Sequence, residues 1–170
     1  MTAYVALLRA VNVGGRQLKM EDLKRIACNN GLDSPRTIIA SGNLLFTSSK
    51  SESELQEMLE TAVTAHMGKP VEVMVRTAKE MADVRAANPF PHLPGNRVYT
   101  TFLNQKAPAD ALAEAKNVTD EQLALGRREI YVAYPGGMGA SKLRIPAAAK
   151  GTARNMNTVI KLAELLKEMS

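Results

Sequence analysis

The sequence of 170 residues predicts an α+β protein built from two parts. Short runs rich in β-branched residues alternate with segments whose apolar residues recur every three or four positions, and this alternation is typical of mixed strands and helices. A stretch with three prolines, residues 88–95, separates an earlier group of such elements from a later one. We therefore expect one domain over residues 1–87 and a second, smaller α+β domain over residues 88–170, closed by an amphipathic helix.

The first predicted strand spans residues 3–11, where a hydrophobic run is interrupted by Arg9. A helix follows from Met20, because apolar residues recur there at helical spacing and acidic residues near its start suit the helix dipole. Gly31 is placed to end this helix. The chain thus begins with a strand followed by a helix.

Two β-rich runs, residues 36–40 and 44–47, come next. They are joined by the three residues Ser-Gly-Asn at 41–43. A three-residue connection with a glycine available for positive φ is typical of a β-hairpin, so we expect these two runs to pair.

A second helix begins at Ser51, whose spacing to Glu54 fits a capping box, and Gly68 is placed to end it. Residues 71–76 then favour a strand. The order strand, helix, strand, strand, helix, strand is that of a ferredoxin-like fold. In that topology the sheet is antiparallel with strand order 4-1-3-2, so the end of the first strand lies beside the hairpin.

The second part follows a predicted helix over residues 77–87 and the proline-rich stretch. Residues 97–103 favour a strand, and residues 108–116 favour a helix that starts with proline. Residues 121–134 favour a pair of strands that turns near residues 126–127. This order predicts a second α+β unit.

The composition is that of an ordinary folded protein, with 45% hydrophobic and 23% charged residues. Lys and Arg number 22 and Asp and Glu 17, so the net charge is +5, which favours anionic partners without choosing between nucleic acid and a small molecule. A single cysteine, Cys28, excludes an internal disulfide and fits a reducing, cytoplasmic location. No run reaches the roughly 18 apolar residues of a membrane span, so we expect no membrane partner.

The first candidate ligand site combines the end of the first strand with the hairpin turn. An arginine can pair with an anion, glycines can turn backbone N–H groups toward it, and amide and hydroxyl side chains can add hydrogen bonds. The alternative is that these residues only make tight turns while the arginine pairs with a carboxylate. The residues are Arg9, Asn12, Gly14, Gly15, Ser41, Gly42 and Asn43.

The second candidate is the glycine-rich stretch 135–144, where Ser141 could cap a helix and Lys142 could lie in its first turn. Backbone donors and a lysine at a helix start can hold a phosphate group. The stretch matches neither the P-loop nor the dinucleotide-binding pattern. The structural alternative is a hairpin or a loop at the exit of a strand.

The third candidate lies at the start of the closing helix, expected over residues 154–169. Thr152 could cap this helix, and Arg154, Asn155 and Asn157 crowd its first turn. An arginine there opposes the helix dipole unless a bound anion or an acidic neighbour lies between them. The alternative is that Arg154 pairs with a carboxylate while the asparagines brace loops.

The usual catalytic and metal-binding patterns are missing from the sequence. His66 and His92 are not at metal-ligand spacing, and the motifs of serine hydrolases and zinc proteases do not occur. An RNA-recognition domain would carry aromatic residues on its two central strands, where only Tyr4 and Phe46 are available. We therefore expect no metal site. The only support for nucleic-acid binding is the positive net charge. The sequence identifies neither catalytic residues nor a cofactor.

Three segments occur together in a recognisable order: residues 4–15, residues 36–46, and residues 141–143 followed by 151–162. In this combination the chain resembles the bacterial family called domain of unknown function sixteen-ninety-seven. The resemblance implies a two-part α+β protein whose first part is ferredoxin-like, with no established reaction, cofactor or catalytic residue. The chain departs from the family's pattern at Ala10, where glycine is common, and at Met156, where an aromatic residue is frequent.

The leading hypothesis from the sequence is a cytoplasmic protein that binds a small anionic or phosphate-bearing molecule in a polar, cationic cleft. Arg9 and Arg154 would supply charge and Lys142 a mobile cation. One alternative is an enzyme of unknown reaction that uses a carboxylate or a lysine in that cleft. Another is a protein interaction or homodimerisation module.

Overall fold

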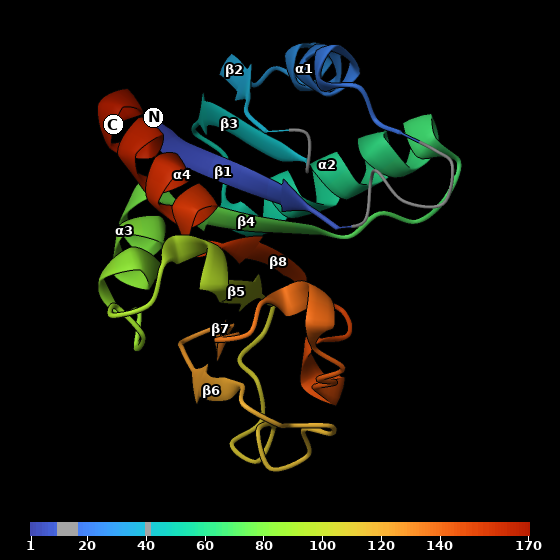
Figure 1. Ribbon diagram of the computed structural model, residues 1–170. Coiled ribbons are helices and arrows are strands. Elements are labelled where there is room, and N and C mark those ends of the chain that lie inside the picture. The colour runs from blue at the N-terminus through green and yellow to red at the C-terminus, as the bar shows by residue number, and fades with distance from the viewer. Residues whose placement is uncertain (10–16, 40–41) are drawn as a thin grey trace. The chain divides into compact units, whose positions relative to one another are not determined.

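The computed structural model describes residues 1–9, 17–39 and 42–170. In these ranges the chain forms eight strands, four α-helices and three short 3₁₀ helices, shown in chain order by the colours of Figure 1. The strands make two four-stranded antiparallel sheets, each built from consecutive strands of the chain. The predicted α+β class is therefore confirmed.

The chain divides into two compact units. The first unit holds residues 1–80 together with 164–170, and the second holds residues 81–163. Both boundaries fall inside helices, so two helices each contribute residues to both units. The expectation that residues 1–87 and 88–170 are separate domains stays a prediction.

The first unit has the order strand, helix, strand, strand, helix, strand. Its sheet has the order β2-β3-β1-β4, which is the predicted order 4-1-3-2 counted from the other edge, so the ferredoxin-like prediction is confirmed. The elements are β1 (Thr2–Leu8), α1 (Met20–Asn29), β2 (Asp33–Thr37), β3 (Asn43–Ser48), α2 (Glu52–Met67) and β4 (Val73–Thr77).

Helices α1 and α2 cover one face of this sheet, because their buried apolar residues share one core with alternate residues of β1, β3 and β4. The ends of α2 follow the sequence signals. Ser51 Oγ accepts a hydrogen bond from the backbone N of Glu54 at 3.3 Å, and Gly68 ends the helix with a φ of 71°. Local capping chemistry thus fixes where α2 begins and ends.

The hairpin between β2 and β3 is displaced from its predicted position. The expected strand 36–40 was wrong by about three residues, since β2 spans Asp33–Thr37. Ile39 has a φ of 59°, which takes the chain out of extended conformation, and Ile38 N donates to Asn43 O at 3.2 Å to close the turn. The left-handed backbone at Ile39 is therefore what ends β2 early.

The sheet of the second unit has the order β6-β7-β5-β8, which repeats the strand order of the first sheet. The strand pair expected over residues 121–134 is confirmed, and Gly126 N donates to Glu129 O at 2.7 Å in its turn. The elements are α3 (Ala78–Ala86), η1 (Gly95–Arg97), β5 (Val98–Phe102), β6 (Gln122–Leu125), β7 (Glu129–Ala133), η2 (Met138–Ala140), η3 (Pro146–Ala148), β8 (Thr152–Asn155) and α4 (Met156–Met169).

The helix predicted over residues 108–116 is wrong. The segment forms consecutive turns, with bonds such as Ala111 N to Pro108 O at 3.0 Å in place of a helical ladder. At its end, Lys116 and Arg144 exchange backbone hydrogen bonds as an isolated antiparallel bridge. This pairing requires extended backbone at Lys116, which a helix continuing through that residue would prevent.

The closing helix begins two residues later than predicted, because α4 spans Met156–Met169. Residues 152–155 form strand β8, which pairs with β5 so that Arg154 lies opposite Thr100. Thr152 is therefore a strand residue, and its predicted role as a helix cap is wrong. Pairing along an open edge of β5 outweighs the local helical pattern here.

Replacing Gly151, which precedes β8, tests how closely the chain packs against β5 at this point. A Cβ there would lie 2.6 Å from Thr101 Cγ2 and 2.7 Å from Phe102 O, so we expect Gly151→Ala to cost about 1–3 kcal/mol in unfolding free energy. Urea denaturation measures the cost. Gly139→Ala is the matched control, since nothing lies within 4 Å of its added Cβ, and equal stabilities of the two variants would contradict the close contact.

Candidate functional site

The end of β1 lies beside the hairpin, as the predicted topology requires. Leu8 N donates to Gly42 O at 2.9 Å, and Arg9 N donates to Glu72 O at 3.0 Å. Arg9 is partly buried at this edge of the sheet. The structure thus brings Arg9 and the hairpin of the first candidate site together.

The hairpin residues of this candidate have structural roles. Gly42 has a φ of 80°, which suits glycine in a tight turn. Asn43 is fully buried, and its Nδ2 donates to Ile38 O at 3.1 Å. This geometry favours the alternative in which these two residues shape the turn. Four predicted members of the site lie outside the described residues: Asn12, Gly14, Gly15 and Ser41.

Arg154 belongs to β8 and not to the first turn of a helix, so the expected conflict with a helix dipole does not arise. Its side chain is buried, and Nη1 donates to Thr152 Oγ1 at 2.6 Å and to Ala153 O at 3.0 Å. Burial lowers the pKa of Arg154 to about 10, which still leaves it charged at neutral pH. Arg154 is thus a buried cation held by its own strand.

The two asparagines of the same stretch organise the start of α4. Asn155 Oδ1 accepts a hydrogen bond from Thr158 N at 2.9 Å, which is the bond a helix cap makes. Asn157 lies so close to Gly95 that a Cβ on that glycine would collide with it. Both asparagines therefore brace the structure, as the alternative for this stretch proposed.

Ser141 and Lys142 do not begin a helix, so that part of the second prediction is wrong. Ser141 follows η2, its Oγ donates to a carboxylate oxygen of Glu121, and the same Oγ accepts from Leu143 N at 3.1 Å. Lys142 is exposed, and its carbonyl accepts from Asn117 Nδ2 at 3.2 Å. The segment is a strand-exit loop that Glu121 holds in place.

Glu121 is a buried carboxylate with several hydrogen bonds in this region. It precedes β6, is only 7% exposed, and accepts hydrogen bonds from Thr119 N at 2.7 Å and Thr119 Oγ1 at 3.1 Å besides the one from Ser141. These bonds, that of Ser141 first, lower the pKa of Glu121 from 4.5 to about 2. The carboxylate is therefore a fixed negative charge at any physiological pH.

A cavity of about 410 Å³ opens beside this carboxylate, within the size range of small-molecule sites. We call it the Glu121 pocket. Its loop wall is held by Arg97, whose Nη1 donates to Pro135 O at 2.9 Å. The lining residues are Thr119, Asp120, Glu121, Gly136, Gly137, Ala140 and Ser141.

Tyr134 connects the pocket to the sheet. Its ring meets Tyr99 edge-to-face with centroids 5.6 Å apart. Burial raises the pKa of Tyr134, and the negative charge of Glu121 raises it further. Both effects keep the hydroxyl protonated.

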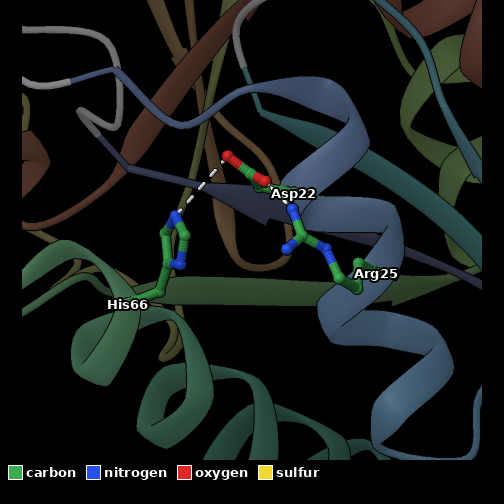
Figure 2. A network of polar contacts seen from close by, with 3 residues as sticks. All are labelled: Asp22, Arg25 and His66. Carbon is green, nitrogen blue, oxygen red and sulfur yellow. Dashed lines mark hydrogen bonds and ion pairs between the residues drawn. The ribbon is translucent and has the colours of Figure 1, made fainter.

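A second polar cluster joins the two helices of the first unit. Figure 2 shows the Asp22 carboxylate between Arg25 of the same helix and the His66 ring of α2, with His66 Nε2 3.7 Å from Asp22 Oδ2. The His66 side chain is 39% exposed, and ion pairs this exposed contribute about 0–1 kcal/mol. The cluster joins α1 to α2 at the surface of the first unit, and its geometry is that of a structural contact.

Comparison with protein families decides where the chain belongs. The family described as "Protein of unknown function (DUF1697)" matches residues 1–131. The chain is a member of the DUF1697 family. The family recognised from the sequence is thereby confirmed. The match covers the first two of the three segments and includes Thr119, Asp120 and Glu121 of the pocket, whereas the third segment lies beyond residue 131.

The fold of this DUF1697 protein is also that of a solved structure. A conserved bacterial protein from Streptococcus pneumoniae is 27% identical, with a TM-score of 0.82 over 98% of this chain and 99% of that one. A comparison with curated proteins finds no match. The relatives thus establish family and fold and assign no ligand or reaction.

The glycine-rich stretch 135–144, predicted as the second candidate site, contains four of the seven lining residues: Gly136, Gly137, Ala140 and Ser141. The other three, Thr119, Asp120 and Glu121, were not predicted. Glu121 was missed because its partner lies 20 positions away and no motif joins them. The predicted strand pair over residues 121–134 could have indicated the position of Glu121. Its register, with Gln122 opposite Ala133, places the residues before β6 beside those after β7.

Substitutions of Asn155 test whether this residue caps α4, as its hydrogen bond to Thr158 indicates, or serves a ligand. Asn155→Ala removes the acceptor for Thr158 N, so we expect a loss of about 1 kcal/mol in unfolding free energy. Asn155→Asp keeps a side-chain acceptor and is expected to retain most of that stability. Urea denaturation compares them, and equal stabilities for the two variants would rule out the cap.

The pH dependence of stability tests the Glu121 environment. Its folded pKa of about 2 lies below its ordinary 4.5, so the ionised group stabilises the fold above pH 4.5 and loses that contribution as the pH falls toward 2. The stability difference between wild type and Glu121→Gln should therefore shrink over that range. Urea denaturation at a series of pH values measures it, and a pH-independent difference would contradict the lowered pKa.

Proposed function

We propose that this DUF1697 protein binds a small polar molecule in the Glu121 pocket. The observation that carries the proposal is a hydrogen-bonded carboxylate in the wall of a cavity large enough for a small ligand. Thr119 and Ser141 add hydroxyl groups to the same wall. A small number of fixed polar groups in a concave site is typical of ligand recognition.

The pocket is organised before any ligand arrives. Glu121 accepts hydrogen bonds from Thr119 in the segment before β6 and from Ser141 in the loop after η2, so it links these two segments. Arg97 donates a hydrogen bond to the backbone carbonyl of Pro135, which lies between β7 and η2. Ligand binding then costs little ordering of loops, which favours affinity. This support does not depend on the identity of the ligand.

The geometry supports binding better than proton transfer. A general base works best when its pKa lies near the working pH, whereas the pKa of Glu121 is about 2. The same low value suits a permanent charge that orients a ligand. The enzyme alternative would therefore need a different acid or base from Glu121.

The anionic-ligand hypothesis stays a second candidate, at the end of β1. The position of Arg9 beside the hairpin of Gly42 favours it, together with the net charge of +5. An anion in the Glu121 pocket would instead meet two carboxylates, those of Asp120 and Glu121. A phosphate-bearing ligand thus fits the edge at Arg9 better than the loop of Ser141 and Lys142.

The remaining partner hypotheses rest on the sequence. Nucleic-acid binding has the net charge in its favour, and homodimerisation is the other open proposal. Over the described ranges, no helix has both the length and the apolar composition needed to cross a bilayer.

A thermal-shift screen of small polar compounds tests the proposed function. A ligand at a hundred times its Kd is expected to stabilise the protein by about 2.7 kcal/mol, which raises Tm by roughly 5–10 °C at this chain length. Ala140 is exposed and lines the pocket, so Ala140→Leu should fill the pocket and abolish the shift.

Two further variants show which site is responsible for the ligand-induced shift in Tm. Ala113→Leu, at an exposed alanine outside the pocket, should keep the ligand shift and serves as the matched control. Arg9→Gln should keep it as well. A shift that survives Ala140→Leu and is lost in Arg9→Gln would reject the Glu121 pocket and support the anion site at the end of β1.

A further inference from the structure

The charge of the Glu121 pocket differs in sign from that of the whole chain. The net charge of the protein is +5, whereas the pocket wall holds the carboxylates of Asp120 and Glu121. All seven lining residues are described, and Lys, Arg and His are not among them. The Arg97 guanidinium lies behind this wall, with Nη1 3.2 Å from the position of a Cβ on Gly137. A ligand in the pocket therefore meets two carboxylates and one nearby guanidinium, which together carry a net negative charge.

Hydrogen bonds rather than cations hold the Glu121 carboxylate in its ionised form. Its partners are the backbone and hydroxyl of Thr119 and the hydroxyl of Ser141, all of which are neutral. Neutral donors fix the position of the carboxylate without cancelling its charge. The charge remains available to a positively charged ligand group.

Asp120 supplies the second charge from a different environment. It is exposed, and its Oδ1 lies 3.3 Å from Thr119 Oγ1, whose single hydroxyl proton it shares with Glu121 Oε1 at 3.1 Å. Its Oδ2 lies near Gly136. A carboxylate offers about four acceptor sites, so this one bond leaves capacity for a ligand donor. Glu121 thus provides a fixed charge and Asp120 an accessible one.

The size of the cavity favours an organic cation over a metal ion. A bound Ca²⁺ takes six to eight oxygen ligands at short distances, and the pocket of about 410 Å³ presents two carboxylates. In the part of the chain that is described, acidic, cysteine and histidine side chains do not form any group of three that could hold a metal. An organic molecule can fill the space and use the hydroxyls of Thr119 and Ser141 as well.

We infer that the ligand of the Glu121 pocket carries an ammonium group, which Asp120 and Glu121 bind while the hydroxyls of Thr119 and Ser141 contact its polar remainder. The inference rests on the proposed function, because it names the chemical class of ligand for the same site. Small amines and diamines are the compounds that this geometry accepts.

Isothermal titration calorimetry with three probes of similar length tests the inference. The probes are 1,4-diaminobutane, 1,4-butanediol and succinate, which differ in charge. At low ionic strength the diamine should bind at least about tenfold more tightly than the diol, because its hydrogen bonds to carboxylates are charge-assisted. Succinate should give no binding, and added salt should weaken the binding of the diamine.

Two variants assign the effect to the carboxylates. Asp120→Asn and Glu121→Gln should each weaken diamine binding about tenfold, whereas Ala113→Leu should leave it unchanged. Because Asp120 is exposed, Asp120→Asn keeps the test valid should Glu121→Gln loosen the loop. Diamine binding of equal strength in Asp120→Asn and wild type would overturn the inference.

The same probes distinguish a failure of the ammonium inference from a failure of the proposed function. Diol or succinate binding that matches the diamine and disappears in Ala140→Leu would reject the ammonium ligand and keep the pocket as the binding site. A screen in which no compound responds to Ala140→Leu would reject the proposed function, and the inference with it.

Discussion

The hydrogen bonds of the Glu121 carboxylate are the constraint on which the candidate site depends. They join the turn at Thr119 to the loop at Ser141, two segments that the β6–β7 hairpin brings to the same end of the sheet. Without them the loop after η2 would still be held at Lys142 by Asn117 and at Arg144 by the bridge to Lys116, but the side chain of Ser141 would lose its bond to the segment before β6. The Glu121 side chain thus helps to shape the cavity and contributes one of its two negative charges.

Much of the first unit could be predicted because its signals are local. Ser51 and Gly68 mark the ends of α2 through capping chemistry that involves neighbours within four residues. The error in β2 has the opposite cause. Ile39 adopts a left-handed conformation that β-branched residues rarely take, so propensity alone extends the strand too far.

The second unit was harder to predict because long-range pairing overrides local pattern. Arg154 is expected from the sequence in the first turn of the closing helix, yet it lies in β8 opposite Thr100. The segment up to Lys116 also has a helical composition, but the bridge to Arg144 ends it in extended backbone. The site was missed for the same reason, since its polar groups meet only after two distant segments are folded together.

Helix α4 begins in the second unit, and its last six residues, 164–169, belong to the first. Proteins are synthesised from the N-terminus, and early domains commonly fold while later ones are still being made. Here the first unit acquires its final residues only after the whole second unit has left the ribosome. All four strands of its sheet lie within residues 1–80, so the sheet is made entirely from residues synthesised early, and the residues of α4 are added to the unit later.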